Sequence, residues 1–136
     1  MQKLIILPTS VTPEIYFSPE EGILRIKGNS SPEDVRSLYY PVIDWMKIFV
    51  EDLLSGQIKN FNNNNPLRFS ADLEYFNSSS AKFLYDIFVE LRRLKETNIP
   101  VIIEWFYDDE DVDHMEAGYD IASLAGMEDA FSGSKK

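Results

Sequence analysis

Three consecutive serines, Ser78, Ser79 and Ser80, follow Asn77 where a strand pattern gives way to a helix pattern. A small polar side chain at a helix start accepts a hydrogen bond from a free amide of the first turn, so capping accounts for part of the run. The position also suits a phosphate, because the exposed amides and the positive end of the helix dipole favour negative charge. From residue types alone, the run indicates either a helix cap or a phosphorylation site.

A hydrolase built on these serines lacks the other groups that the reaction needs. Serine hydrolysis requires a base and an orienting acid, and the single histidine, His114, lies far from Ser78 in sequence. The chain has no cysteine, and the Gly-x-Ser-x-Gly pattern of a nucleophile elbow is absent. We therefore predict that the chain is not an enzyme and has no catalytic residues.

The acidic segment from Asp108 to Glu116, with His114 inside it, is the candidate for a metal site. A calcium loop needs alternating oxygen ligands and a glycine for the turn, and the glycine is missing from the required position. The acids equally suit the first turn of a helix, where the dipole favours them. A metal-dependent hydrolase using Asp108–Glu116 stays as an alternative of another class. The main prediction includes no metal and no cofactor, since no glycine-rich phosphate loop occurs either.

Four segments have strand patterns. Residues 67–75 alternate apolar and polar side chains, and residues 101–107 are mostly apolar. Residues 15–17 and 22–28 indicate two short strands joined by a hairpin.

Three segments have helix patterns. The first is expected to begin with Ser31 as its N-cap and Pro32 in its first turn, and to end near Gly56. The second carries a buried stripe from Phe83 to Leu94, and the third runs from the acidic segment to about Leu124. Strands joined through helices need crossover connections, so the order of elements predicts an α/β fold. We expect one domain over residues 1–136, with a mixed sheet of about four strands, helices packed on it and a disordered tail at residues 132–136.

Charge and hydropathy restrict the partner. Thirteen basic residues against 23 acidic ones give a net charge of −10, which would repel a nucleic-acid backbone and favours a protein partner with basic patches. No apolar run reaches the roughly 18 residues of a membrane span, and the apolar run at residues 4–7 is too short for a signal peptide. We expect a soluble, cytoplasmic protein that binds neither nucleic acid nor membrane.

The serine run and its surroundings resemble a known family. Residues 72–80, reading Asp-Leu-Glu-Tyr-Phe-Asn-Ser-Ser-Ser, are similar to the strand-to-helix segment of SiaC-type regulatory phosphoproteins. Three further similarities follow the family's order along the chain: Ser30-x-Pro32-Glu33, Val42-Ile43-Asp44-Trp45 and Trp105-x-Tyr107-Asp108. The resemblance covers nearly the whole chain and implies a STAS-like domain, similar in fold to anti-anti-sigma factors.

The resemblance also implies a function. In the family a Ser/Thr kinase phosphorylates a residue at this position, a PP2C-type phosphatase reverses it, and the unphosphorylated form binds and activates a diguanylate cyclase. Carried over by position, the phosphorylated residue is Ser78, where some members have threonine; Ser79 and Ser80 are poorer candidates. The residues expected to contact a partner are Asn77, Ser78, Ser79, Tyr107 and Asp108.

A second output of the same kind of switch is an anti-anti-sigma role, in which the chain captures an anti-sigma kinase. Only the identity of the partner separates this role from activation of a cyclase.

The sequence departs from the family in the asparagine-rich loop before Pro66, which looks like an insertion.

Overall fold

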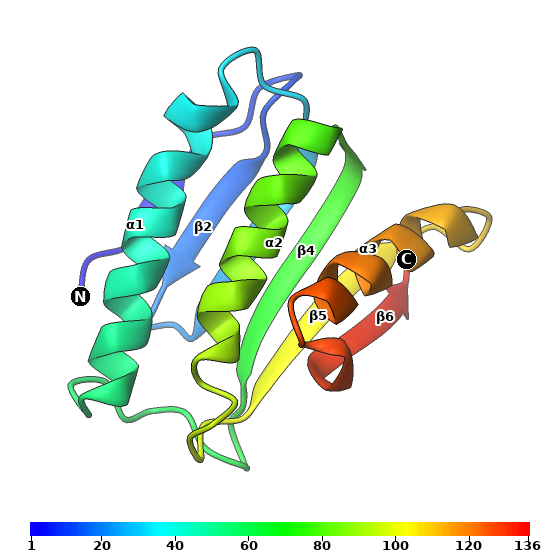
Figure 1. The fold of residues 1–136 in the computed structure, drawn as a ribbon. Helices are drawn as coiled ribbons and strands as arrows, with labels where there is room; N and C mark the ends of the chain where they lie inside the picture. The colour runs from blue at the N-terminus through cyan, green and yellow to red at the C-terminus, as the bar shows by residue number, and fades with distance from the viewer.

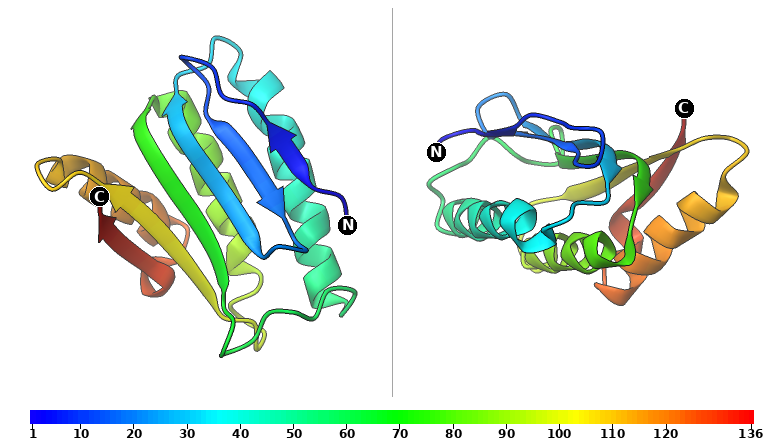
Figure 2. Two further views of the ribbon diagram at one scale, coloured as in Figure 1. Left: turned by 180° about the vertical axis from the view of Figure 1, so that it is seen from behind. Right: turned by 90° about the horizontal axis from the view of Figure 1, so that it is seen from above.

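The computed structural model describes residues 1–136 as six strands and three α-helices. In chain order these are β1 (Leu4–Ile6), β2 (Glu14–Ser18), β3 (Ile23–Ser30), α1 (Val35–Leu54), β4 (Leu67–Phe76), α2 (Ser78–Arg92), β5 (Val101–Tyr107), α3 (Val112–Leu124) and β6 (Phe131–Lys135), with a short 3₁₀ turn, η1 (Glu128–Ala130), before β6. The strands form one sheet, ordered β1 to β6 as in the chain, and all three helices cover the same face of it (Figure 1). The termini lie at opposite edges of the sheet (Figure 2).

The sheet is mixed, as the sequence predicts. Strands β1, β2 and β3 pair antiparallel, and β3, β4, β5 and β6 pair parallel. Parallel pairing brings the carboxyl ends of β3, β4 and β5 to one edge, where α1, α2 and α3 begin. We call this the carboxyl edge. The predicted α/β fold with helices packed on a mixed sheet is confirmed.

The predicted count of about four strands is wrong, because the strands at the two outer edges have weak sequence patterns. Strand β1 has only three residues, too few to show an alternation. Strand β6 reads Phe-Ser-Gly-Ser-Lys and forms through backbone pairing with β5, from Ile103↔Phe131 to Tyr107↔Lys135. Residues 132–135, expected to be disordered, therefore belong to the sheet.

The predicted cap of α1 is also wrong. Its N-cap is Asp34, whose side chain accepts a hydrogen bond from the amide of Ser37 at 3.1 Å. Ser31 instead donates its backbone N–H to the Val11 carbonyl at 2.8 Å, and Pro32 is buried in the loop that follows β3. The chain must cross from the sheet layer to the helix layer before it turns, which moves the start of the helix along by three residues.

The core lies between the sheet and the helices. The predicted stripe of α2 is confirmed, since Phe83, Leu84, Ile87, Phe88 and Leu91 are all buried. None of the three α-helices combines the length and the apolar character needed to cross a bilayer.

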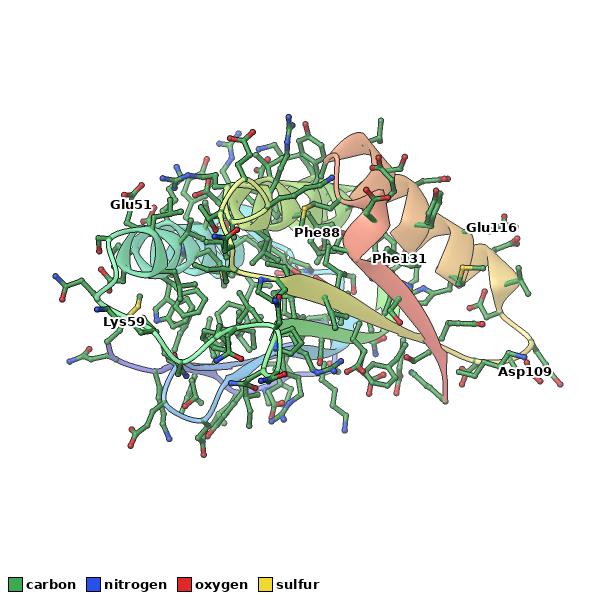
Figure 3. The ribbon with its side chains drawn as sticks, turned by 90° about the horizontal axis from the view of Figure 1, so that it is seen from below. Glu51, Lys59, Phe88, Asp109, Glu116 and Phe131 are labelled. Carbon is green, nitrogen blue, oxygen red and sulfur yellow. The ribbon has the colours of Figure 1, made fainter.

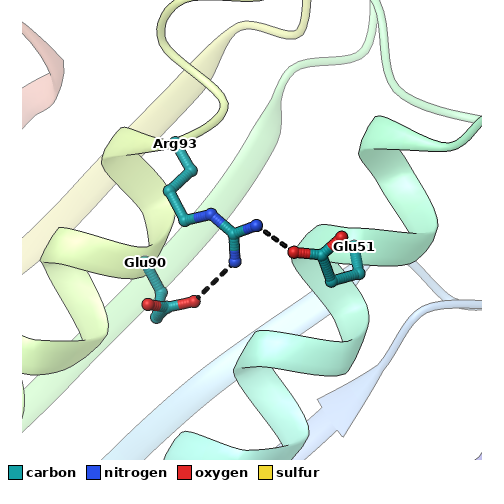
Figure 4. A network of polar contacts seen from close by, with 3 residues as sticks. All are labelled: Glu51, Glu90 and Arg93. Carbon is teal, nitrogen blue, oxygen red and sulfur yellow. Dashed lines mark hydrogen bonds and ion pairs between the residues drawn. The ribbon is translucent and has the colours of Figure 1, made fainter.

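An exposed ion-pair network joins α1 and α2 near their carboxyl ends (Figure 4). Arg93 pairs with Glu90 of its own helix at 3.0 Å and with Glu51 of α1. Ion pairs with exposed partners contribute little to stability, so this network adds little to the packing of the two helices.

A β-bulge turns the end of β4. Gly28 pairs with Leu73 but Asn29 pairs with Tyr75, so Glu74 is an extra residue on β4. Gly28 has a φ of +120°, which a residue with a side chain rarely adopts. Beyond the bulge Tyr75 is 56% exposed, while Phe76 packs edge-on against Trp105, with 5.7 Å between ring centroids.

Helix α3 packs closely on β5 at Gly118. A Cβ at Gly118 would lie 2.3 Å from Cε2 of the fully buried Trp105 indole. The indole Nε1–H donates to the carbonyl of His114 at 3.1 Å, so the ring cannot move away without losing this bond. Only a residue without a side chain fits at this position.

We expect Gly118→Ala to lower the free energy of unfolding by about 1–3 kcal/mol, because overpacking of the core outweighs the better helix propensity of alanine. Urea unfolding followed by circular dichroism measures this. Ser123→Ala, at an exposed position of the same helix, is the matched control and should change stability little. A Gly118→Ala protein as stable as the parent would contradict the close packing.

Candidate functional site

The serine run lies at the carboxyl edge, where α2 starts immediately after β4. Asn77 is the N-cap, and its side-chain Oδ1 accepts a hydrogen bond from the amide of Ser80 at 2.9 Å. The amide of Asn77 donates to the carbonyl of Ser30, at the end of β3, also at 2.9 Å. The sequence prediction that this segment caps the helix is confirmed, and Asn77 supplies the cap. None of the three serines is therefore needed as the N-cap.

The three serines lie in different environments. Ser78 and Ser79 are exposed, whereas Ser80 is fully buried. The Ser80 hydroxyl donates to the carbonyl of Ser30 at 3.0 Å and accepts from the Ser30 hydroxyl at 2.7 Å. An enzyme could reach Ser78 or Ser79 in the folded protein, but Ser80 only after the helix start had opened.

A third buried hydroxyl extends this contact into α1. The Tyr39 phenol lies 2.6 Å from the Ser30 hydroxyl. Burial, only partly opposed by the neighbouring Ser30 and Ser80 hydroxyls, raises the pKa of Tyr39, so the phenol stays protonated and can donate. We call Ser30, Tyr39 and Ser80 the hydroxyl relay. It joins β3, α1 and α2 beneath the serine run.

Aromatic side chains surround the first two turns of α1 and α2. Tyr39 stacks on Phe83 with 5.3 Å between ring centroids, and Tyr40 meets the same ring edge-on at 5.8 Å. The Lys82 ammonium lies 4.9 Å from the centroid of the Phe83 ring. Tyr40 is 53% exposed, so an aromatic surface lies beside the serine-bearing turn.

The structure adds Tyr40 and Tyr75 to the residues predicted from sequence. Both are large, exposed aromatic side chains, a type that often anchors protein interfaces. Tyr40 could have been noticed, because it stands beside the stripe of α1. Tyr75 could not, because the bulge that exposes it leaves no mark in the alternation of residues.

Tyr107 and Asp108 also lie at the carboxyl edge, at the end of β5, which is parallel to β4. Tyr107 is half-buried and Asp108 is exposed. Phe76, the residue before Asn77, packs against His114 of α3 with 5.5 Å between ring centroids. The structure thus places the five predicted contact residues along one edge, in two groups: Asn77, Ser78 and Ser79, and then Tyr107 and Asp108.

The acidic segment does not assemble into a metal site. Asp111 is the N-cap of α3, accepting from the amide of His114 at 3.1 Å, and Asp109 pairs with Lys135 at 3.0 Å. Asp109 points outward from the loop before α3, and Glu116 points outward from the helix itself (Figure 3). No three His, Cys, Asp or Glu side chains of residues 1–136 come together in a geometry that could hold a metal ion. The segment caps the start of α3, and its acidic side chains face solvent.

Comparison with known protein families matches residues 6–128 to a family described as SiaC family regulatory phosphoprotein. The chain belongs to this family. The match runs from the last residue of β1 to the first residue of η1 and confirms the resemblance seen in the sequence. An uncharacterized protein of Pseudomonas aeruginosa strain UCBPP-PA14 is 35% identical over 108 residues, which are 79% of this chain and 78% of that protein.

Solved structures give the same family. The crystal structure of apo-SiaC from Pseudomonas aeruginosa is 29% identical with a TM-score of 0.74, covering 100% of this SiaC-family chain and 99% of that chain. A chain in the crystal structure of the diguanylate cyclase SiaD in complex with its activator SiaC, from the same organism, is 28% identical with a TM-score of 0.80, covering 98% and 99%. The six-stranded fold with its helix start at Ser78 is therefore the SiaC fold.

His114 introduces a pH dependence at this edge. Its ring lies between those of Trp105, at 5.2 Å, and Phe76, and its buried Nε2 has no hydrogen-bond partner. Burial lowers the pKa of His114 below its usual 6.5; Lys136 lowers it further, while Asp111 and Asp108 oppose the shift. The unfolded chain therefore binds a proton more readily than the folded protein as the pH falls below 6.5.

We expect the free energy of unfolding to decrease between pH 7.5 and pH 5.5, a range above the usual pKa of the carboxylates, so that the only histidine dominates the change. Urea unfolding at the two pH values measures it. His114→Phe keeps a ring between Trp105 and Phe76 and should flatten the dependence. An equal slope in the parent and in His114→Phe would show that His114 is not the titrating group.

Proposed function

We propose that this SiaC-family chain acts by binding and not by catalysis. Unphosphorylated, it binds and activates a diguanylate cyclase; phosphorylated on Ser78, it releases that partner. The observation that carries the proposal is that Ser78, the first residue of α2, is exposed. It is not needed as the helix cap, because Asn77 supplies the cap. The likeness to the SiaC chain solved with a diguanylate cyclase favours a cyclase over an anti-sigma kinase as the partner.

The helix start can carry a phosphate without unfolding. Ser78 and Ser79 are the first residues of α2, and their amides have no acceptor within the helix. These amides and the helix dipole favour an anion at this position. Phosphorylation would thus act on the surface of the protein and leave its fold intact.

The surroundings of Ser78 explain how a phosphate would release a partner. A partner that covers Ser78 would also meet the exposed Tyr40 ring of α1, which packs against Phe83 in the second turn of α2. A phosphate adds nearly two negative charges to this surface, which already lies in a chain of net charge −10. The nearest lysine along α2, Lys82, is already paired with Asp86. Covering the phosphate with an aromatic contact surface would therefore remove its water without supplying a free cation, and such a burial is costly.

The switch needs two enzymes, and we propose a Ser/Thr kinase and a PP2C-type phosphatase that act on Ser78 in the cytoplasm. Both could reach Ser78 in the folded protein because it lies at the carboxyl edge and is exposed. Ser80 is a poorer site for phosphorylation, because its hydroxyl is buried and both accepts and donates a hydrogen bond.

We expect Ser78→Ala to bind the cyclase like the parent and Ser78→Asp to bind at least about tenfold more weakly, a loss of about 1.4 kcal/mol from burying one unpaired charge. Pull-down of the cyclase from the cells that produce this protein, followed by calorimetry with the purified pair, measures the binding of both variants. Ser123→Asp is the matched control, since it adds the same charge to an exposed site near the far end of α3. Equal binding by Ser78→Ala and Ser78→Asp would refute the switch.

A further inference from the structure

Neither helix capping nor core packing explains why the three hydroxyls of the relay are buried. Only three polar side chains other than tyrosine are buried in the chain, Ser18, Ser30 and Ser80, and two of them belong to the relay. A buried hydroxyl stabilises less than an apolar group of the same size unless its hydrogen bonds are made. A buried network whose hydrogen bonds are all made holds the elements around it in one particular arrangement.

We propose that Ser30, Tyr39 and Ser80 are positioning residues for Ser78. They hold the first turn of α2 so that its free amides surround position 78 and stabilise negative charge there. The inference rests on the proposed function for its biological meaning, because a phosphate on Ser78 is the charge that this arrangement would receive.

One arrangement of protons satisfies every donor in the relay. The Tyr39 phenol donates to the Ser30 hydroxyl, which donates to the Ser80 hydroxyl, which donates to the Ser30 carbonyl. That carbonyl also accepts the amide of Asn77. Each bond polarises the next in the same direction, so the chain is stronger than three separate bonds.

The relay holds the third residue of α2 from two sides. The Ser80 amide bonds to the Asn77 side chain, and the Ser80 hydroxyl bonds to the end of β3. With Ser80 anchored inward, Ser78 and Ser79 project outward. If the anchor were lost, the turn would fray and the amides of its first residues would no longer point together at position 78.

The relay also fixes α1 to α2 at the level of the serine run. Tyr39 reaches the relay with its hydroxyl and stacks on Phe83 of α2 with its ring. Near the other end of the two helices, their ion-pair tie is the network of Arg93, in which the Glu51 side chain is 62% exposed. The buried tie at the helix starts is the stronger one. It holds the start of α1, which carries the exposed Tyr40 ring, beside the start of α2.

The absence of cysteine from the chain permits a direct test without kinase or partner. In a Ser78→Cys variant the thiol is the only one, and the pH dependence of its alkylation by iodoacetamide gives its pKa. A helix N-terminus lowers the pKa of a thiol from about 8.5. We expect a lowered pKa in Ser78→Cys, and a rise of about half a unit or more when Ser80→Ala is added.

Tyr39→Phe is the second variant. It keeps the ring stacked on Phe83 and removes only the first donor of the relay, so a smaller rise in the thiol pKa is expected. It stays informative if Ser80→Ala does not fold. Ser123→Ala, which removes an exposed hydroxyl on α3 outside the relay, is the matched control and should leave the thiol pKa unchanged.

An ordinary thiol pKa in Ser78→Cys, or a lowered one that both folded relay variants leave unchanged, would overturn the inference. A general loss of stability cannot imitate the expected result, because circular dichroism and thermal melting report stability separately. The assay also separates this inference from the proposed function. Failure of the thiol test leaves the switch at Ser78 standing, and absence of a cyclase partner leaves the thiol result standing.

Discussion

The carbonyl oxygen of Ser30 accepts two hydrogen bonds, one from the amide of Asn77 and one from the hydroxyl of Ser80. The first bond ties the end of β4 to the end of β3, and the second ties the first turn of α2 to the same point. The Ser30 hydroxyl is hydrogen-bonded to the Tyr39 phenol and so connects α1 to the same point. The position of the serine run relative to both the sheet and the neighbouring helix therefore depends on one residue at the end of one strand.

The bulge at Glu74 is the second constraint at this edge. A strictly alternating β4 would send Tyr75 toward the helices, on the same face as Leu73. The extra residue reverses the end of the strand, so that Phe76 enters the core beside Trp105 and Tyr75 is exposed. Bulges occur often beside functional sites because they redirect a side chain without altering the rest of a sheet. Here the redirected side chain stands three residues before Ser78.

The parts of the fold that follow from residue periodicity could be predicted from the sequence. The buried stripe of α2, the alternation of β4 as far as Leu73 and a helix cap within residues 77–80 all depend on neighbours in the chain, and all three agree with the structure. The strand β6 could not be predicted, since its small and polar residues pair only because β5 offers an open edge. Nor could the start of α1, because the bond between Ser31 and Val11 joins segments that are distant in sequence.

The same distinction applies to the site. Position in the chain and family resemblance both indicate Ser78, but the difference between an exposed Ser78 and a buried Ser80 depends on Ser30, which is 50 residues away. Sequence alone shows three similar hydroxyls. The structure gives one of them to the core and leaves Ser78 and Ser79 accessible at the edge.

Phosphosite mass spectrometry on the protein purified from its own cells, grown under several conditions, tests the central claim most directly. The account predicts phosphate on Ser78 in a fraction of molecules that changes with growth condition, and none on the buried Ser80. A Ser78 that carries no phosphate under any condition would contradict it, and would reduce the exposed serine to an ordinary residue of a capped helix start.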